Sequence, residues 1–167
     1  MCRFAASAAL DALADAGLGP LATIEQEVAP CGLSCGKCLA YGDGEIRRHA
    51  AALKEALGDN FASYAERFAG MNPAFAGYEG FRELLEFLSN GSCTGCRGQG
   101  CLFGDCTVKA CVRERGVSYC FQCDDFPCAT HGLPEFLAKR WQENNEQMRD
   151  KGVSVYALEL RGRHRYP

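Results

Sequence analysis

The spacing of hydrophobic residues predicts helices along most of the chain. After a glycine-rich turn at residues 42–44, one apolar face recurs at helical spacing, formed by Ile46, Ala50, Leu53 and Leu57. The same spacing follows Asn60, at Phe61, Tyr64, Ala65 and Phe68. Asn72 and Pro73 are typical of an N-cap followed by the first helical position, and they predict a further helix that ends near Ser89.

The helical period fades between Gly91 and Cys128, where glycine and cysteine dominate. One helical turn is predicted there, around residues 107–115. A last long helix is then predicted from Leu133, Phe136, Leu137 and Trp141, and Gly152 should end it. The final segment, residues 153–167, alternates weakly between apolar and polar residues and predicts no helix of its own. The prediction is a mainly α protein: a small helical domain with an irregular, cysteine-rich, metal-bound lobe.

Three regions are expected along the chain. Residues 1–28 predict an amphipathic helix and a linker, residues 29–160 a single cysteine-rich metal-binding domain, and residues 161–167 a basic tail. Asp11 and Asp15 interrupt the apolar N-terminal stretch, which the hydrophobic core of a secretory signal would not tolerate. No apolar run reaches the length of a membrane helix. We therefore expect a cytoplasmic protein that does not associate with a membrane.

Composition and charge narrow the choice of partners. The chain has 167 residues, of which 47% are hydrophobic and 23% charged, so it should fold as a globular protein. Its formal net charge of -3 argues against a nucleic-acid-binding protein. The basic residues Arg161, Arg163, His164 and Arg165 leave two alternatives, contact with RNA or an ordinary solvated tail. We expect a protein partner and no nucleic acid.

The cysteines carry the strongest chemical signal in the sequence. Apart from Cys2, which stands alone, they fall into an early group with the spacing C-x3-C-x2-C and a later block that contains two C-x2-C pairs. Two intervening residues allow a tight turn to direct both sulfurs at one ion. In a reducing compartment such clusters indicate metal sites rather than disulfides. The candidate ligands are Cys31, Cys35, Cys38, Cys93, Cys96, Cys101, Cys106, Cys111, Cys120, Cys123 and Cys128.

Thiolates suit both zinc and iron–sulfur clusters, so the metal stays open at this point; zinc is favoured and [4Fe–4S] clusters are the alternative. The early group has three thiolates where a closed site needs four, so we predict that its fourth ligand comes from the later block. His131 is a possible fourth ligand for Cys120, Cys123 and Cys128, or else simply a residue at the start of a helix. Radical S-adenosylmethionine enzymes use the early spacing too, but they need an alternating βα pattern that this sequence lacks.

Four stretches carry a resemblance to a known family: CGLSCGKCLAY, GSCTGCRG, KACVRERGVSYCFQCDDFPC and LPEFLAKRWQENNEQMRDKGV. In these the chain resembles domain-of-unknown-function family 3795, a bacterial and archaeal family of cysteine-rich proteins. The resemblance implies a metal-binding domain of unassigned function. It also implies a ligand role for all the candidate cysteines except Cys101, whose spacing differs from the family pattern.

The sequence contains no recognisable nucleophile–base pair, phosphate-binding glycine loop or paired carboxylates, so any catalytic residue is unknown. The first functional expectation is a structural metal, which holds a lobe that presents a surface to a protein partner. The alternatives are an iron–sulfur protein in electron transfer or redox enzymology, and a thiol-based sensor of metal or redox state.

Overall fold

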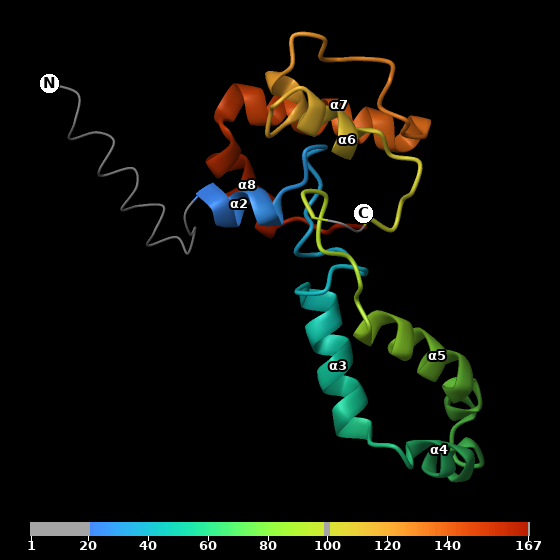
Figure 1. Ribbon diagram of the computed structural model, residues 1–167. Coiled ribbons are helices and arrows are strands. Elements are labelled where there is room, and N and C mark those ends of the chain that lie inside the picture. Colours follow the sequence, from blue (N-terminus) through green and yellow to red (C-terminus); the bar gives the residue numbers. More distant parts are fainter. Residues whose placement is uncertain (1–20, 99–100, 167) are drawn as a thin grey trace, which may run out of the picture.

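The computed structural model describes residues 21–98 and 101–166, and these form a mainly α protein, as predicted (Figure 1). Within these ranges the only β contacts are two isolated bridges, Val28 with Ser34 and Tyr41 with Cys93. The amphipathic helix expected before residue 21 lies outside the described residues. The elements in chain order are α2 (Leu21–Glu27), α3 (Glu45–Leu57), α4 (Phe61–Ala69), η1 (Pro73–Gly77), α5 (Tyr78–Ser89), α6 (Val108–Glu114), η2 (Cys120–Gln122), α7 (Glu135–Lys151) and α8 (Val153–Arg161).

Residues 45–89 form a helical arm that projects from the rest of the protein (Figure 1). Helices α3 and α5 pack side by side along it, and α4 with η1 closes its far end. The arm buries few side chains, mainly Ala50, Ala65 and Leu85. The beginning and the end of the arm lie side by side where it joins the rest of the protein. There the Arg47 guanidinium donates to the carbonyl of Ser89 over 3.2 Å.

The remaining described residues, which we call the body, hold two adjoining hydrophobic clusters. One lies between α2, α7 and α8 and consists of Ile24, Val28, Tyr119, Met148, Tyr156 and Ala157. The other lies between α6 and α7 and mixes apolar side chains with thiols: Ala29, Cys31, Val108, Val112, Cys120 and Trp141. Because cysteines form part of this core, the body depends on the state of its thiols.

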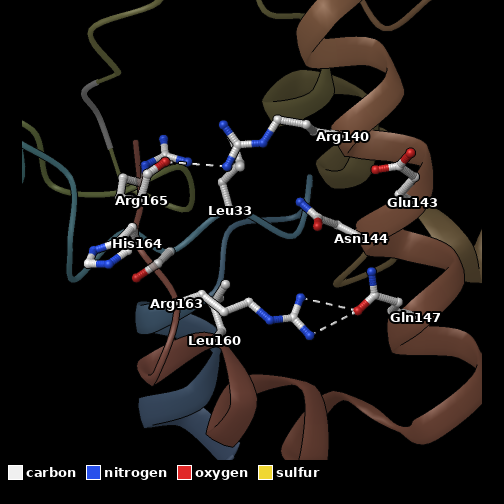
Figure 2. A pocket seen from close by; sticks show the side chains of 10 residues that line it. Leu33, Arg140, Glu143, Asn144, Gln147, Leu160, Arg163, His164 and Arg165 are labelled. Atoms are coloured by element: carbon white, nitrogen blue, oxygen red, sulfur yellow. Dashed lines mark hydrogen bonds between the residues drawn. The ribbon is translucent and has the colours of Figure 1, made fainter. Parts of the chain in front are cut away.

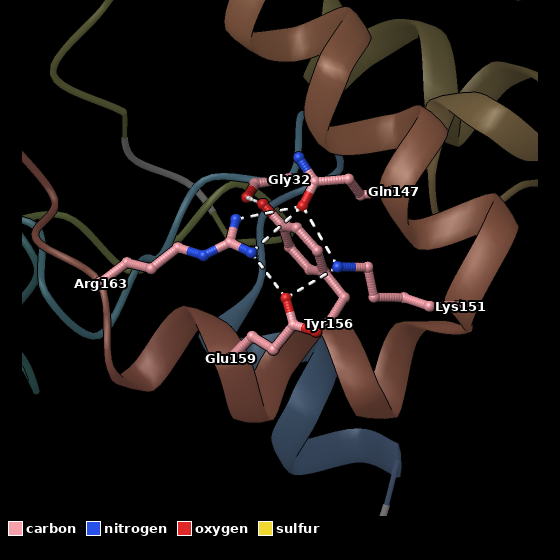
Figure 3. Close-up of polar contacts among 6 residues, drawn as sticks. All are labelled: Gly32, Gln147, Lys151, Tyr156, Glu159 and Arg163. Carbon is pink, nitrogen blue, oxygen red and sulfur yellow. Dashed lines mark hydrogen bonds and ion pairs between the residues drawn. The ribbon is translucent and has the colours of Figure 1, made fainter.

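The loop that carries Cys31, Cys35 and Cys38, which we call the early cysteine loop, is attached to the C-terminal helices by specific contacts (Figure 3). The Tyr156 hydroxyl, fully buried, donates to the carbonyl of Gly32 over 2.6 Å. Gly32 itself has a φ of 78°, and a Cβ built on it would lie 2.4 Å from the Cβ of Asn144. Only glycine therefore allows this loop to approach α7 so closely.

Two local predictions need correction. The helix expected from Pro73 begins as a 3-10 turn, and the α-helix starts only at Tyr78. Asn72 still acts as the N-cap, since its side chain accepts from the amide of Ala74 over 3.0 Å. The second correction is α8, which occupies the segment where the sequence suggested only weak alternation. None of the helices in the described ranges has the length and hydrophobicity needed to cross a bilayer.

Candidate metal-binding site

The eleven candidate cysteines divide between two cavities in the body. Seven of them line one cavity of about 370 Å³, which we call the seven-cysteine cavity: Cys31, Cys35, Cys38, Cys93, Cys96, Cys101 and Cys106. The other four line a narrow space of about 20 Å³ beside Trp141, and we call them the four-cysteine group: Cys111, Cys120, Cys123 and Cys128. None of these eleven described cysteines forms a disulfide.

The seven-cysteine cavity brings the early motif and the start of the later block together, as a ligand set drawn from both would require. The backbone joins them directly, because the amide of Cys93 donates to the carbonyl of Ala40 and the amide of Gly42 donates to that of Cys93, each over 2.9 Å. The Cys35 and Cys96 thiols share a hydrogen bond. Residues from two distant parts of the sequence therefore form one site, and the arm is the chain that connects them.

The four-cysteine group is built around α6 and η2. Cys111 lies within α6, and Cys120 and Cys123 begin and follow η2. The spacing had suggested His131 as the fourth member, but the structure places Cys111 there instead. The His131 ring packs against Trp141 with centroids 4.8 Å apart, and its Nδ1 accepts from the amide of Leu133 over 2.9 Å. His131 thus lies in the loop before α7, whose N-cap is Pro134 and whose first residue is Glu135, and not at the helix start that the sequence offered as the alternative.

Several sulfurs have backbone amides directed at them. The amide of Gly95 lies 3.3 Å from the sulfur of Cys93, and the amides of Val108 and Lys109 at the start of α6 donate to Cys106. Such amides stabilise thiolates, including metal-bound ones. Burial has the opposite effect and raises the pKa of Cys31 to about 12 and that of Cys120 to about 11.

The Cys35 and Cys96 thiols act as one titrating pair. Their hydrogen bond lowers the pKa of Cys35 and raises the pKa of Cys96, because the proton stays on Cys96 while it donates to the Cys35 sulfur. Arg165 and Arg97 also favour the Cys35 thiolate by their charge. This pair is the part of the seven-cysteine cavity where negative charge is best supported.

In the described ranges, no three cysteine, histidine, aspartate or glutamate side chains are already arranged to hold a metal ion. The sulfurs of the larger group surround a space instead of converging on one point. The residues around the four-cysteine group do offer one feature that suits bound thiolates. The indole Nε1 of Trp141 is buried in the wall of that space, and the Cys120 sulfur is its acceptor there. This contact favours the Cys120 thiolate and opposes the effect of burial on its pKa.

The basic tail folds back onto the cysteine loop, so it is not an ordinary solvated terminus. Arg161 pairs with Glu27 over 2.9 Å, and the Lys37 ammonium, inside the early motif, donates to the carbonyls of Arg161 and Arg163. The Tyr166 hydroxyl accepts from the amide of Leu39 and lies 3.8 Å from the Cys38 sulfur. These contacts make the tail part of the cavity wall, a role that its composition did not indicate.

Arg97, which directly follows Cys96, connects three segments of the body. Its guanidinium donates to the carbonyls of Glu25, Val28 and Ser118 over 2.5 to 2.8 Å, and it lies 4.9 Å from the centre of the Tyr119 ring. The geometry depends on the planar, multiple-donor form of arginine.

Replacing Arg97 by alanine is expected to lower the free energy of unfolding by about 2–4 kcal/mol, because three partly buried carbonyls lose a charged donor. Arg97→Lys should recover only part of the loss. The matched control is Arg82→Ala, since Arg82 is 57% exposed and pairs only with Glu79 on its own helix; its effect should stay below about 0.5 kcal/mol. Urea unfolding measures all three, and equal effects at Arg97 and Arg82 would contradict the bridging role.

Trp141 is 3% exposed and packs edge-on against Phe126, with ring centroids 5.0 Å apart. Trp141→Ala is expected to cost about 3–5 kcal/mol through the cavity it leaves in the thiol-containing core. Trp141→Phe keeps the ring and removes the indole N–H, so it should cost distinctly less. Circular dichroism is the suitable measurement, because the chain has a single tryptophan and both variants lose its fluorescence. Similar costs for both variants would assign the main effect to the N–H group instead of to packing.

The fold and the site together define a mainly α, cysteine-rich protein. One protein family, described as "Protein of unknown function (DUF3795)", matches residues 27–132, and the chain belongs to this family. That range includes all eleven candidate cysteines and the helical arm, while α7 and α8 lie beyond it. Comparisons with curated proteins and with solved structures each found no match.

Proposed function

We propose that this protein is a cytoplasmic metal-binding protein in which an iron–sulfur cluster occupies the seven-cysteine cavity and a zinc ion occupies the four-cysteine group. The observation that carries the proposal is the unequal division of the cysteines, seven around a large cavity and four around a narrow one. The cluster would exchange one electron at a time with a second redox protein, and the zinc would stabilise the fold.

The size of the larger cavity favours a cluster. Zinc bonds four sulfurs at about 2.3 Å, so a closed zinc site has no empty space between its ligands. A cavity of about 370 Å³ lined by seven cysteines provides far more room and more thiolates than one zinc ion uses. Four of the seven would suffice for a [4Fe–4S] cluster. Zinc, the metal that the sequence analysis favoured, fits the four-cysteine group better.

The four-cysteine group has the number of ligands of a structural zinc site. Its space of about 20 Å³ has no room for a cluster beside the existing side chains. The contact of the Trp141 Nε1 with the Cys120 sulfur supports a thiolate there, because a zinc-bound sulfur accepts such a hydrogen bond. The ion would draw the four sulfurs together, so part of its binding energy would be folding energy.

Exposed apolar residues lie around the seven-cysteine cavity and support electron exchange with a protein partner. Leu102 is 66% and Phe136 69% exposed, and both line the cavity, together with the less exposed Phe103. An apolar rim allows a partner protein to approach closely and exclude water from the cluster. The short distance this creates is what single-electron transfer requires.

The test is purification without oxygen, followed by measurement of iron, acid-labile sulfide and zinc per chain. We expect iron and sulfide in equal amounts, about one zinc per chain, and visible absorption that decreases on addition of dithionite. Protein that contains zinc only, without colour, would contradict the cluster and favour the second candidate function. Folded protein with no metal in either site would contradict both.

The second candidate is a purely structural metal protein whose role is to present a surface to a partner. The helical arm favours it, because it exposes several large apolar side chains along its length, among them Tyr64, Met71, Leu84 and Phe87. In this case both cysteine groups would hold zinc. The metal analysis above separates the two candidates directly.

A further inference from the structure

We propose that the pocket between α7 and the C-terminal tail binds a small organic anion that carries phosphate or carboxylate groups. The pocket has a volume of about 440 Å³, within the range of ordinary small-molecule sites (Figure 2). Its polar lining comes from α7, from the early cysteine loop and from the tail, chiefly Arg140, Asn144, Arg163, His164, Arg165 and Ser34.

The lining is strongly basic in a protein whose net charge is -3. Three arginines and a histidine face a single carboxylate, that of Glu143. This carboxylate lies 3.9 Å from the Lys139 ammonium, which partly offsets its charge. The net effect is a local positive potential that attracts anions.

Two of the arginines have unused capacity to bind an anion. Among the ion pairs formed in the described ranges, none includes Arg140 or Arg165. Arg140 makes one hydrogen bond, over 3.3 Å, to the carbonyl of Arg165, and the buried Nε of Arg165 has no partner. Guanidinium groups match the geometry of phosphate and carboxylate, which they bind through paired hydrogen bonds.

Arg163 has a different role and makes the pocket rigid. Its guanidinium pairs with Glu159 over 2.6 Å and donates to the Gln147 amide oxygen over 3.2 Å (Figures 2 and 3). Glu159 also pairs with Lys151 over 2.7 Å. The tail is therefore held across α7 before any ligand arrives, which lowers the entropic cost of binding.

A small molecule fits these observations better than RNA does. The basic residues are held in a concave pocket with Leu33 and Leu160 in its wall. Arg161, the remaining arginine of the tail, forms an ion pair with Glu27. RNA contact would need the same charges spread over an open surface. Since Arg140, Arg165 and Leu33 also line the seven-cysteine cavity, a bound anion would lie directly beside it.

Isothermal titration of the purified 167-residue chain, in phosphate-free buffer at low and at raised salt, tests the proposal. The titrants are pyrophosphate, inorganic phosphate and citrate. We expect one site with a Kd of about 10–100 µM for pyrophosphate or citrate, weakened by salt. Pyrophosphate binding without citrate binding would identify phosphate as the preferred group, and the reverse would identify carboxylates.

Arg140→Gln and Arg165→Gln should each weaken binding by about tenfold or more. The matched control is Arg149→Gln, on the same helix, where the side chain is 52% exposed and lies beside Asp150; it should bind as the unmodified protein does. Absence of saturable binding by the unmodified protein would overturn the proposal, whatever the variants do. So would binding that both pocket variants retain.

One competing explanation is that Arg140 and Arg165 serve only as counter-charges for the thiolates. Variants that lose metal, in a protein that binds no anion, would establish that explanation and overturn ours. A single-stranded RNA oligonucleotide that binds and is not displaced by pyrophosphate would also overturn it, in favour of a nucleic-acid surface. Because these readouts do not require a cluster, the proposal stands or fails independently of the proposed function.

Discussion

Replacing Cys35 and Cys96 together by serine is expected to remove iron, sulfide and visible absorption from the protein while about one zinc per chain remains. The two thiols share a hydrogen bond on the wall of the seven-cysteine cavity, so both are lost from the same place. The double change is preferable to a single one, because it breaks both C-x2-C pairs that line the cavity, Cys35 with Cys38 and Cys93 with Cys96, and the five cysteines left include no pair at the spacing that directs two sulfurs at one ion. Metal and sulfide analysis of anaerobically purified protein gives the result directly.

The reciprocal variant is Cys123→Ser, which should release the zinc and leave the iron–sulfur absorption in place. The four-cysteine group has no spare thiol, so one substitution is enough. Cys2→Ser is the matched control, since Cys2 stands apart from both cysteine motifs in the sequence, and both metals should remain. Loss of both metals in either variant, with helical circular dichroism retained, would show that the eleven cysteines form one interdependent centre and would contradict the division.

Most of the fold could be predicted because its helices are amphipathic. The faces of α3 and α4 follow directly from apolar residues three and four positions apart. The same signal was present for α8, at Val153, Tyr156, Ala157 and Leu160, and was hidden by the neighbouring alternation of polar and apolar residues. In α8 the buried residues Tyr156 and Ala157 are adjacent in sequence, which fits a helix packed on one side and does not fit a strand with one exposed face.

The cysteines that line the two cavities could be picked out from the sequence, but their grouping could not. Cys106 and Cys111 are only five positions apart, yet they line different cavities, because the first turn of α6 separates them. Which cavity a cysteine faces depends on where α6 packs, and spacing does not contain that information. The arginines of the pocket were missed for the same reason: Arg140 and Arg165 are far apart in sequence and meet only when the tail crosses α7.

The contacts that attach the arm to the body determine how far the loss of structure caused by metal removal should extend. The amide of Glu45, at the first position of α3, donates to the carbonyl of Gly36 in the early motif, over 2.9 Å. At the other end of the arm, Gly91 packs against the backbone of Tyr41. Loss of metal would therefore free both ends of the arm while its own contacts between α3 and α5 remain.

Chelation of the metals is expected to increase amide hydrogen exchange at least about 100-fold in residues 28–44 and 91–98 and in residues 101–133, with a smaller change in α3 and α5. The first three segments contain the cysteines and little regular structure, so bound metal replaces a core that they do not otherwise possess. Structural zinc contributes about 10–16 kcal/mol in small metal-dependent domains, which is comparable with the whole stability of a typical protein. Helices α7 and α8 should show an intermediate change, because Met148 and Tyr156 pack in a cluster that contains no cysteine.

Exchange measured by mass spectrometry before and after anaerobic chelation resolves these regions. An equal rise in exchange throughout the described ranges would mean that arm and body unfold as a single cooperative unit, and unchanged exchange around the cysteines would mean that the metals do not stabilise the fold.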